Sequence, residues 1–144
     1  MITYEDIAAF REEMDAASKP PLTVAQMVEI FADTMRQEKN PDMSAKLIKE
    51  EMEEWLEEYW CYAGLLTCDE DYQPATELKE LADLVYVIYG YARARGWDLE
   101  EAVRRVHQNN IDRCVQPDGG VKYREDGKVL KNPSAPKIDL GDLV

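Results

Sequence analysis

The sequence has few of the residues that bind transition metals or form disulfide bridges. It contains one histidine and three cysteines among 144 residues, and no Cys-x-x-Cys pair. An odd cysteine count without such a pair argues against a disulfide framework or a zinc site. We therefore expect Cys61, Cys68 and Cys114 to be reduced, with the first two at most near each other across a turn. One histidine cannot supply the Glu-x-x-His pairs of a di-iron bundle, and we expect His107 to pack or form hydrogen bonds rather than act as a general base.

Basic residues are also scarce. The chain has 17 Lys and Arg against 30 Asp and Glu, which gives a formal net charge of −13. A protein of this charge lacks the broad basic face that binds a nucleic-acid backbone, so we expect no nucleic-acid partner. To bind a small polyanion, a protein this acidic would need metal ions and a few local cations.

Long apolar runs are absent as well. The longest, residues 81–92, is too short to span a bilayer and contains Asp83. Residues 1–6 have neither a basic region nor an apolar run. We therefore expect no secretory signal, no membrane partner and a cytoplasmic location.

The residues that are present predict helices. Hydrophobic residues make up 45% of the chain, which is enough for one domain with its own core. Apolar positions recur at helical spacing in five segments, residues 3–17, 24–38, 43–66, 75–94 and 98–114. Thr3, Thr23 and Asp98 stand where N-caps are expected, and Gly96 stands where the fourth helix should end.

The last part of the chain has a different pattern. Residues 121–130 predict a short hairpin around the turn residues Asp126 and Gly127, followed by a tail. We expect a single all-α domain with a four-helix-bundle-like core. Its predicted parts are an N-terminal helix at 3–17, the core at 22–115, and the hairpin and tail at 117–144.

The helix predicted around residues 46–60 places a carboxylate inside an apolar stripe. At about 100° per residue, Glu51 falls between Leu47 and Trp55 on the helix surface. Glu54 falls at the edge of the stripe, whereas Glu50 points to solvent. Burying a carboxylate is costly unless a cation or a hydrogen-bond donor pairs with it.

A second acidic pair lies on the next helix. Glu80 and Asp83 are three residues apart and share a face in an otherwise apolar stretch. Two such helices can bring four carboxylates to one point, where they repel unless protonated or occupied by cations. Oxygen ligands favour Mg²⁺, with Mn²⁺ as the alternative ion. The competing interpretation is that Glu51, Glu54, Glu80 and Asp83 are solvated charges on acid-rich helices.

These acids also carry a family resemblance. Glu50-Glu51-x-x-Glu54 followed by Glu80-x-x-Asp83 resembles the EExxE…ExxD signature of the MazG-like, all-α nucleoside triphosphate pyrophosphohydrolases. That superfamily includes dimeric dUTPases and phosphoribosyl-ATP pyrophosphohydrolase. The resemblance implies that Glu51, Glu54, Glu80 and Asp83 are the Mg²⁺ ligands and the catalytic acids, and that Glu50 is a further member of the motif. Because Glu50 points outward on its helix, we do not expect it to bind the metal.

A second stretch extends the resemblance to residues 22–133. Residues 106–113 resemble a helix of phage and bacterial MazG-like proteins, and residues 123–131 resemble the segment after it. The family often continues Gly-Pro-Asn there, whereas this chain has Asn132-Pro133-Ser134. By resemblance, Asn110 and Arg113 contact the nucleotide, and we expect Lys128 to assist in binding the triphosphate.

The resemblance implies hydrolysis of a nucleoside triphosphate between its α- and β-phosphates, giving a nucleoside monophosphate and pyrophosphate. Candidate substrates are dUTP, dCTP, dGTP, a damaged nucleotide or a signalling nucleotide, in nucleotide-pool control or house-cleaning. So many apolar helix faces indicate a homodimer or homotetramer, as in the family. Two alternatives remain: a non-catalytic acidic helical protein that mimics nucleic acid, and a metal-binding regulatory module without turnover.

Overall fold

A computed structural model describes residues 1–17, 21–68 and 71–144, and within these ranges the chain forms helices and no strand. The prediction of an all-α fold is confirmed. The chain divides into two compact units, Met1–Trp97 and Asp98–Val144, which are described separately. The single-domain organisation stays a prediction. Parts of the predicted break after the first helix and of the loop at residues 67–74 lie outside the described residues.

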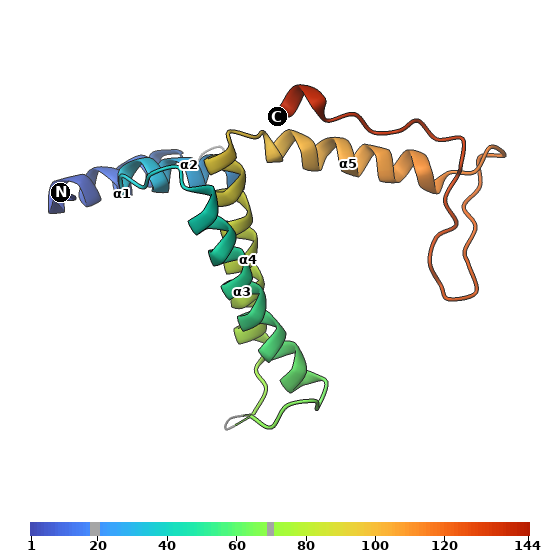
Figure 1. Cartoon of the computed structure of the whole chain (residues 1–144), viewed down its shortest axis with the longest axis horizontal. Coiled ribbons are helices and arrows are strands. Elements are labelled where there is room, and N and C mark those ends of the chain that lie inside the picture. The colour runs from blue at the N-terminus through green and yellow to red at the C-terminus, as the bar shows by residue number, and fades with distance from the viewer. Residues whose placement is uncertain (18–20, 69–70) are drawn as a thin grey trace. The chain divides into compact units, whose positions relative to one another are not determined.

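The first unit is built on an antiparallel pair of long helices (Figure 1). These are α3 (Pro41–Tyr62) and α4 (Pro74–Arg95), which make the most extensive helix contact of the unit. Helix α2 (Val24–Thr34) packs on α4, and α1 (Tyr4–Ala17) packs on α2. Phe31 of α2 makes edge-to-face contacts with Phe10 and Tyr86, with ring centroids 6.2 and 5.9 Å apart. These aromatic contacts join α1, α2 and α4 into one small core.

The helix starts follow local sequence signals. The Thr23 hydroxyl accepts from the Gln26 backbone N–H at 3.2 Å, and Oε1 of the Gln26 side chain accepts from the Thr23 backbone N–H at 2.9 Å. This predicted capping box is confirmed. Helix α3 begins at Pro41, two residues before the predicted start, because Asn40 caps it and proline is favourable in the first helical turn.

The helix ends depart more from prediction. Helix α2 stops at Thr34 rather than at residue 38, and Arg36 has a left-handed φ of 53°. Helix α3 stops at Tyr62 rather than at residue 66, two residues before Gly64, whose φ of 71° turns the chain out of the helix. Helix α4 ends as predicted at Gly96, which has a φ of 73°.

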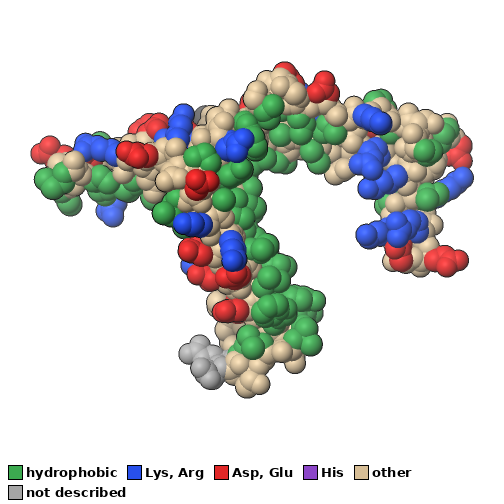
Figure 2. Space-filling model, in the orientation of Figure 1, with side chains coloured by type: hydrophobic (Ala, Val, Ile, Leu, Met, Phe, Trp, Pro, Cys, Tyr) green, Lys and Arg blue, Asp and Glu red, His purple; other side chains and the backbone are tan. Residues whose placement is uncertain are grey.

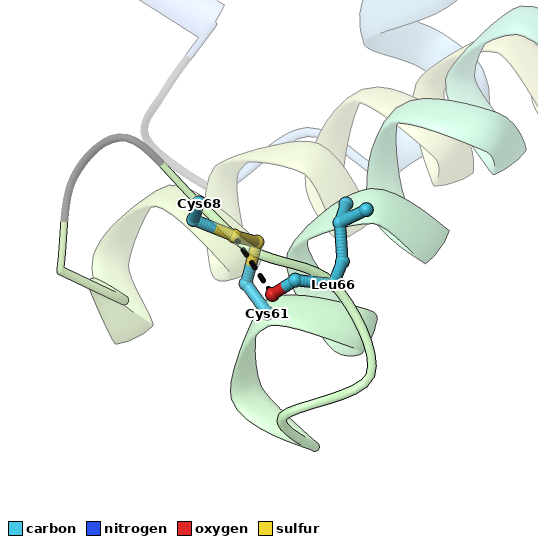
Figure 3. Close-up of a disulfide and its surroundings, with 3 residues drawn as sticks. All are labelled: Cys61, Leu66 and Cys68. Atoms are coloured by element: carbon cyan, nitrogen blue, oxygen red, sulfur yellow. Dashed lines mark hydrogen bonds between the residues drawn. A yellow bond between two sulfur atoms is a disulfide. The ribbon is translucent and has the colours of Figure 1, made fainter.

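The expectation that all three cysteines are reduced is wrong for two of them. Cys61, in the last turn of α3, forms a disulfide with Cys68 of the loop that follows, and the Leu66 carbonyl lies beside it (Figure 3). The turn after Tyr62 brings their Cα atoms to 6.1 Å, a separation that a disulfide can bridge. Sequence spacing could predict proximity across the turn but not the bond itself. Cys114 is free and half-buried.

The second unit consists of α5 (Leu99–Cys114), the 3-10 helix η1 (Gly141–Leu143) and the chain between them. Asp98 caps α5 as predicted, accepting from the Glu101 N–H at 3.1 Å. The tail runs back beside α5 to η1 (Figure 1). The predicted hairpin is reduced to a single bridge between Tyr123 and Val129, closed by a turn at Gly127.

Few side chains are fully buried in this single chain. Among the described residues only Val28, Ala32 and Ala92 are buried hydrophobic residues. Leu81 and Val85 of α4 are 37% and 44% exposed, although they lie in the apolar stretch at residues 81–92. Only α2 and α3 pack against α4 extensively, so part of its apolar surface stays open. No helix in the described residues is long and apolar enough to cross a membrane.

Candidate functional site

Three of the four acids singled out from the sequence meet between α3 and α4. Glu51 and Glu54 are on α3 and Glu80 is on α4, and one carboxylate oxygen from each lies within 4.8 Å of the others. Their i, i+3 spacing on α3 and the antiparallel packing of the two helices produce this convergence. We call these three residues the acid cluster.

Two oxygens of the acid cluster are buried without a hydrogen-bond partner. They are Glu51 Oε2 and Glu80 Oε2. Burial raises the pKa of the Glu51 carboxyl above its ordinary value, and the hydrogen bond and negative charge of Glu54 raise it further. Burial and Glu54 likewise raise the pKa of Glu80, while the Lys79 ammonium opposes the shift. The cluster therefore concentrates more negative charge than its neighbours neutralise.

Asp83, the fourth predicted ligand, is placed differently. Its Oδ2 forms an ion pair with Nζ of Lys79, one turn away on α4, at 2.6 Å. Its charge still raises the pKa values of Glu51 and Glu80, so it lies within electrostatic reach of the acid cluster. The i, i+4 spacing of Lys79 and Asp83 could have predicted this ion pair from the sequence. Glu50 is exposed, in agreement with its predicted outward direction.

The acid cluster fits a hard divalent cation. All its ligand atoms are carboxylate oxygens, the donors that Mg²⁺ and Mn²⁺ prefer. A cation would satisfy the buried oxygens of Glu51 and Glu80 that the protein leaves unpartnered. It would also offset the mutual repulsion that raises their pKa values.

A hydrogen-bonded clamp lies one turn from the acid cluster toward the α3–α4 connection. Glu77 accepts from Trp55 Nε1 at 3.0 Å and from the Tyr72 hydroxyl at 2.5 Å. Trp55 is one turn beyond Glu51 on α3, and Glu77 is one turn before Glu80 on α4. We call Trp55, Tyr72 and Glu77 the Glu77 clamp. Sequence analysis missed it, although Glu77 shares the i, i+3 spacing that drew attention to Glu80 and Asp83.

An apolar pocket lies on the other side of the acid cluster along the same two helices. It has a volume of about 220 Å³ and is lined by residues from α2, the α2–α3 turn, α3 and α4. Leu47 in its wall precedes Glu51 by one turn, and Val87 follows Asp83 by one turn. Phe31 and Tyr86 supply its aromatic surface. This pocket therefore begins within one helical turn of the acids.

The remaining predicted site residues belong to the second unit. Asn110 is exposed on α5, Arg113 is half-buried in its last turn, and Lys128 is exposed beyond the Gly127 turn. The His107 side chain is exposed and forms no hydrogen bond within the described chain, so the expectation that it packs or forms hydrogen bonds is wrong. The tail contacts α5 at Arg105 and Asn109, on either side of His107, which faces elsewhere.

Comparison with known proteins relates the chain to a family of pyrophosphohydrolases. Residues 24–110 match the family model described as phosphoribosyl-ATP pyrophosphohydrolase. This range holds more than half of the chain and includes the acid cluster, Asp83 and Asn110, but it ends before Arg113 and Lys128. No curated protein sequence matches the chain.

Proposed function

Because the chain belongs to the phosphoribosyl-ATP pyrophosphohydrolase family, part of the MazG-like all-α superfamily, we propose that it hydrolyses a nucleoside triphosphate with Mg²⁺ as cofactor. Membership supports a pyrophosphohydrolase that acts on a nucleotide-like substrate. The reaction we propose cleaves between the α- and β-phosphates and releases a nucleoside monophosphate and pyrophosphate. The nucleotide and the metal ion are the parts of this proposal that need testing.

The observation that carries the proposal is the pair of buried, unpartnered oxygens of Glu51 and Glu80. Together with Glu54, these residues would hold the cation, and Asp83 would join them if its carboxylate turned from Lys79. A bound divalent cation would offset the negative charge of the phosphate oxygens and make a water molecule a better nucleophile.

The chain's own residues would orient the substrate around that point. The Glu77 clamp fixes α3 and α4 against each other one turn away, which keeps the cluster oxygens converged. The apolar pocket beside Leu47 and Val87 could enclose the nucleoside end. By resemblance, Asn110 and Arg113 of the second unit would contact the nucleotide, and Lys128 would assist in binding the triphosphate.

A pyrophosphate-release assay over the common deoxynucleoside triphosphates tests the proposal. We expect turnover that requires Mg²⁺ and falls about 100-fold or more in Glu54→Ala and in Asp83→Ala, because each change removes charge that acts on the cation. Glu53→Ala is the matched control, since Glu53 is on the same helix and pairs at its surface with Lys49. Full activity in both Ala variants of the site would contradict the roles assigned here.

The printed family name favours a second substrate. Phosphoribosyl-ATP should therefore be included in the same panel. Preference for it over every simple triphosphate would assign this substrate instead. No turnover on any nucleotide, with Mg²⁺ still bound, would support the regulatory, non-catalytic alternative.

We also propose that the protein works as a homodimer or homotetramer. Hydrophobic side chains gather along one long side of the α3–α4 pair, while acidic and basic side chains gather on the other (Figure 2). Exposed hydrophobic side chains on these two helices, each at least 37% exposed in the single chain, include Met52, Tyr59, Trp60, Leu81 and Val85. A face of this extent on a small protein is typical of a surface that a partner covers.

A further inference from the structure

A pocket lies within the second unit, between the end of α5 and the tail. Its volume is about 470 Å³, within the range of roughly 300–1,000 Å³ that is typical of small-molecule sites. Arg113 and Asn109 line it from α5, and residues 131–138 of the tail form the rest of its wall. Figure 1 shows the tail running beside α5 over this stretch.

Hydrogen bonds between α5 and the tail shape the wall of this pocket. The Asn132 N–H donates to the Arg113 carbonyl at 2.6 Å, and Asn109 Nδ2 donates to the Pro136 carbonyl at 2.9 Å. Asn132 Oδ1 accepts from the Ser134 N–H at 2.9 Å, which holds the tail's turn in place. The two ends of the tail segment are therefore attached to the helix before any ligand binds.

The charge of this pocket is opposite to that of the chain. Arg113, Lys131 and Lys137 line it, and no acidic residue does. None of these three forms an ion pair within the described part of a chain whose net charge is −13. By contrast, Arg104, Arg105, Lys122 and Arg124 of the same unit do form ion pairs, such as that of Arg105 with Asp142 at 2.6 Å. Three uncompensated cations around one hollow mark a site for an anion.

We propose that this pocket binds the linked phosphate groups of a small ligand, either free pyrophosphate or the phosphate chain of a nucleotide. Three cations match the charge of a diphosphate or triphosphate, and a guanidinium can bind two phosphate oxygens at once. The Nδ2 group of Asn132 is left to donate to a further oxygen. Arg113 is the only residue shared with the proposed function, and the pocket needs neither the acid cluster nor turnover.

Calorimetric titration of the full chain with inorganic pyrophosphate, in excess EDTA, tests this site without the metal. We expect saturable binding by the wild type. The double variant Lys131→Gln, Lys137→Gln should bind at least about tenfold more weakly, because charge-assisted contacts to phosphate are lost. Both lysines are exposed, so the variant should keep its fold, which circular dichroism checks.

A charge-matched double variant is the control. Lys122→Gln, Arg124→Gln removes the same charge from the same unit, but these residues pair with Asp118 and Asp126 away from the pocket. Its affinity should stay within about twofold of the wild type. An equal loss in control and pocket variants, or no saturable binding of pyrophosphate or nucleotide by the wild type, would overturn the proposal.

Two further titrations assign the source of the phosphate groups. A non-hydrolysable nucleoside triphosphate that binds much more tightly than pyrophosphate would identify an intact nucleotide as the ligand. Similar affinities would identify the phosphate chain alone. A nucleoside without phosphate should not bind. If the nucleoside bound as tightly as the triphosphate, the proposal that this pocket recognises phosphate groups would be refuted.

Discussion

At the scale of single residues, the acid cluster is a local source of instability in the folded chain. Glu51 and Glu80 each carry a buried oxygen without a partner, and their pKa values are raised. Such groups destabilise the folded state until something neutralises them. Three carboxylates whose oxygens lie within 4.8 Å of one another, two of them with raised pKa values, are typical of a functional site.

Replacing Glu80 with glutamine should have opposite effects on stability and on cation binding. In EDTA, Glu80→Gln should raise the midpoint of thermal unfolding by roughly 2–4 °C, because a buried charge and its repulsion disappear. In the same variant Mg²⁺ should bind at least about tenfold more weakly. Thermal denaturation with and without Mg²⁺ measures both effects. Glu53→Gln should change neither, and a destabilised metal-free Glu80→Gln would contradict this account.

The stability of the metal-free protein should fall as pH rises. The folded-state pKa values of Glu51 and Glu80 are raised, so the folded state holds these protons more tightly than the unfolded state. Their contribution is greatest below the unfolded value of about 4.3 and is lost as pH rises through the raised folded values. Urea denaturation in EDTA measures the slope. A double Glu51→Gln, Glu80→Gln variant with the same slope as the wild type would rule out these two groups as its cause.

At the scale of elements, the α3–α4 pair depends on a few polar contacts as well as on packing. The Glu77 clamp joins the two helices between the acid cluster and the Cys61–Cys68 disulfide. Glu77 accepts hydrogen bonds from both Trp55 and Tyr72. The bond from Trp55 fixes the register of α3 against α4, where an apolar contact alone would allow the helices to slide.

The Tyr72 hydroxyl provides a direct readout of the clamp. Its hydrogen bond to Glu77 is the largest cause that raises the pKa of Tyr72 to about 12. We expect an ultraviolet titration of the phenolate, with Tyr72→Phe subtracted, to find this value. Glu77→Gln removes the negative charge and should return the pKa toward about 10. A Tyr72 that titrates normally in the wild type would show that the clamp does not form in solution.

In the second unit, one ion pair holds the end of the tail to α5. Arg105 donates to both carboxylate oxygens of Asp142, at 2.6 and 2.9 Å. This hydrogen bond is the main cause that lowers the pKa of Asp142 below its ordinary value. The pairing is therefore fully present above the unfolded-state pKa of about 3.9 and is lost as pH falls through the lowered folded value.

Asp142→Asn should release the tail near η1 without unfolding α5. We expect amide hydrogen exchange to rise at residues 139–143, because the bidentate charge pair is lost, and to stay unchanged in α1. The wild type should show the same rise only in strong acid. Unchanged exchange in the variant would mean that the remaining contacts of η1 with α5 are sufficient.

At the scale of the whole molecule, the apolar face of α3 and α4 predicts self-association. Sedimentation equilibrium should give a dimer or tetramer for the wild type. Val85→Glu should shift it toward monomer, because Val85 is 44% exposed on α4 and a partner that covers this helix would bury the new charge. Tyr4→Glu is the matched control, since Tyr4 is 87% exposed on α1. A monomeric wild type at all concentrations would contradict the proposed assembly.

The sequence by itself determined the helices, most of their caps and the position of the acids within apolar stripes. These features depend on spacing within one helix, as the Thr23 capping box, the Gly96 cap and the i, i+3 pairs illustrate. The early ends of α2 and α3 were missed because they depend on backbone turns at Arg36 and Gly64 rather than on periodicity.

Only the tertiary structure decided which side chains from different segments meet. Examples are the disulfide between Cys61 and Cys68, the two hydrogen bonds that Glu77 accepts, and the cationic pocket between α5 and the tail. The tertiary structure also left one face of α4 uncovered, although the sequence of that helix is apolar on nearly all sides. Local spacing fixes the direction of a side chain on its own helix, whereas its partner depends on the three-dimensional path of the rest of the chain.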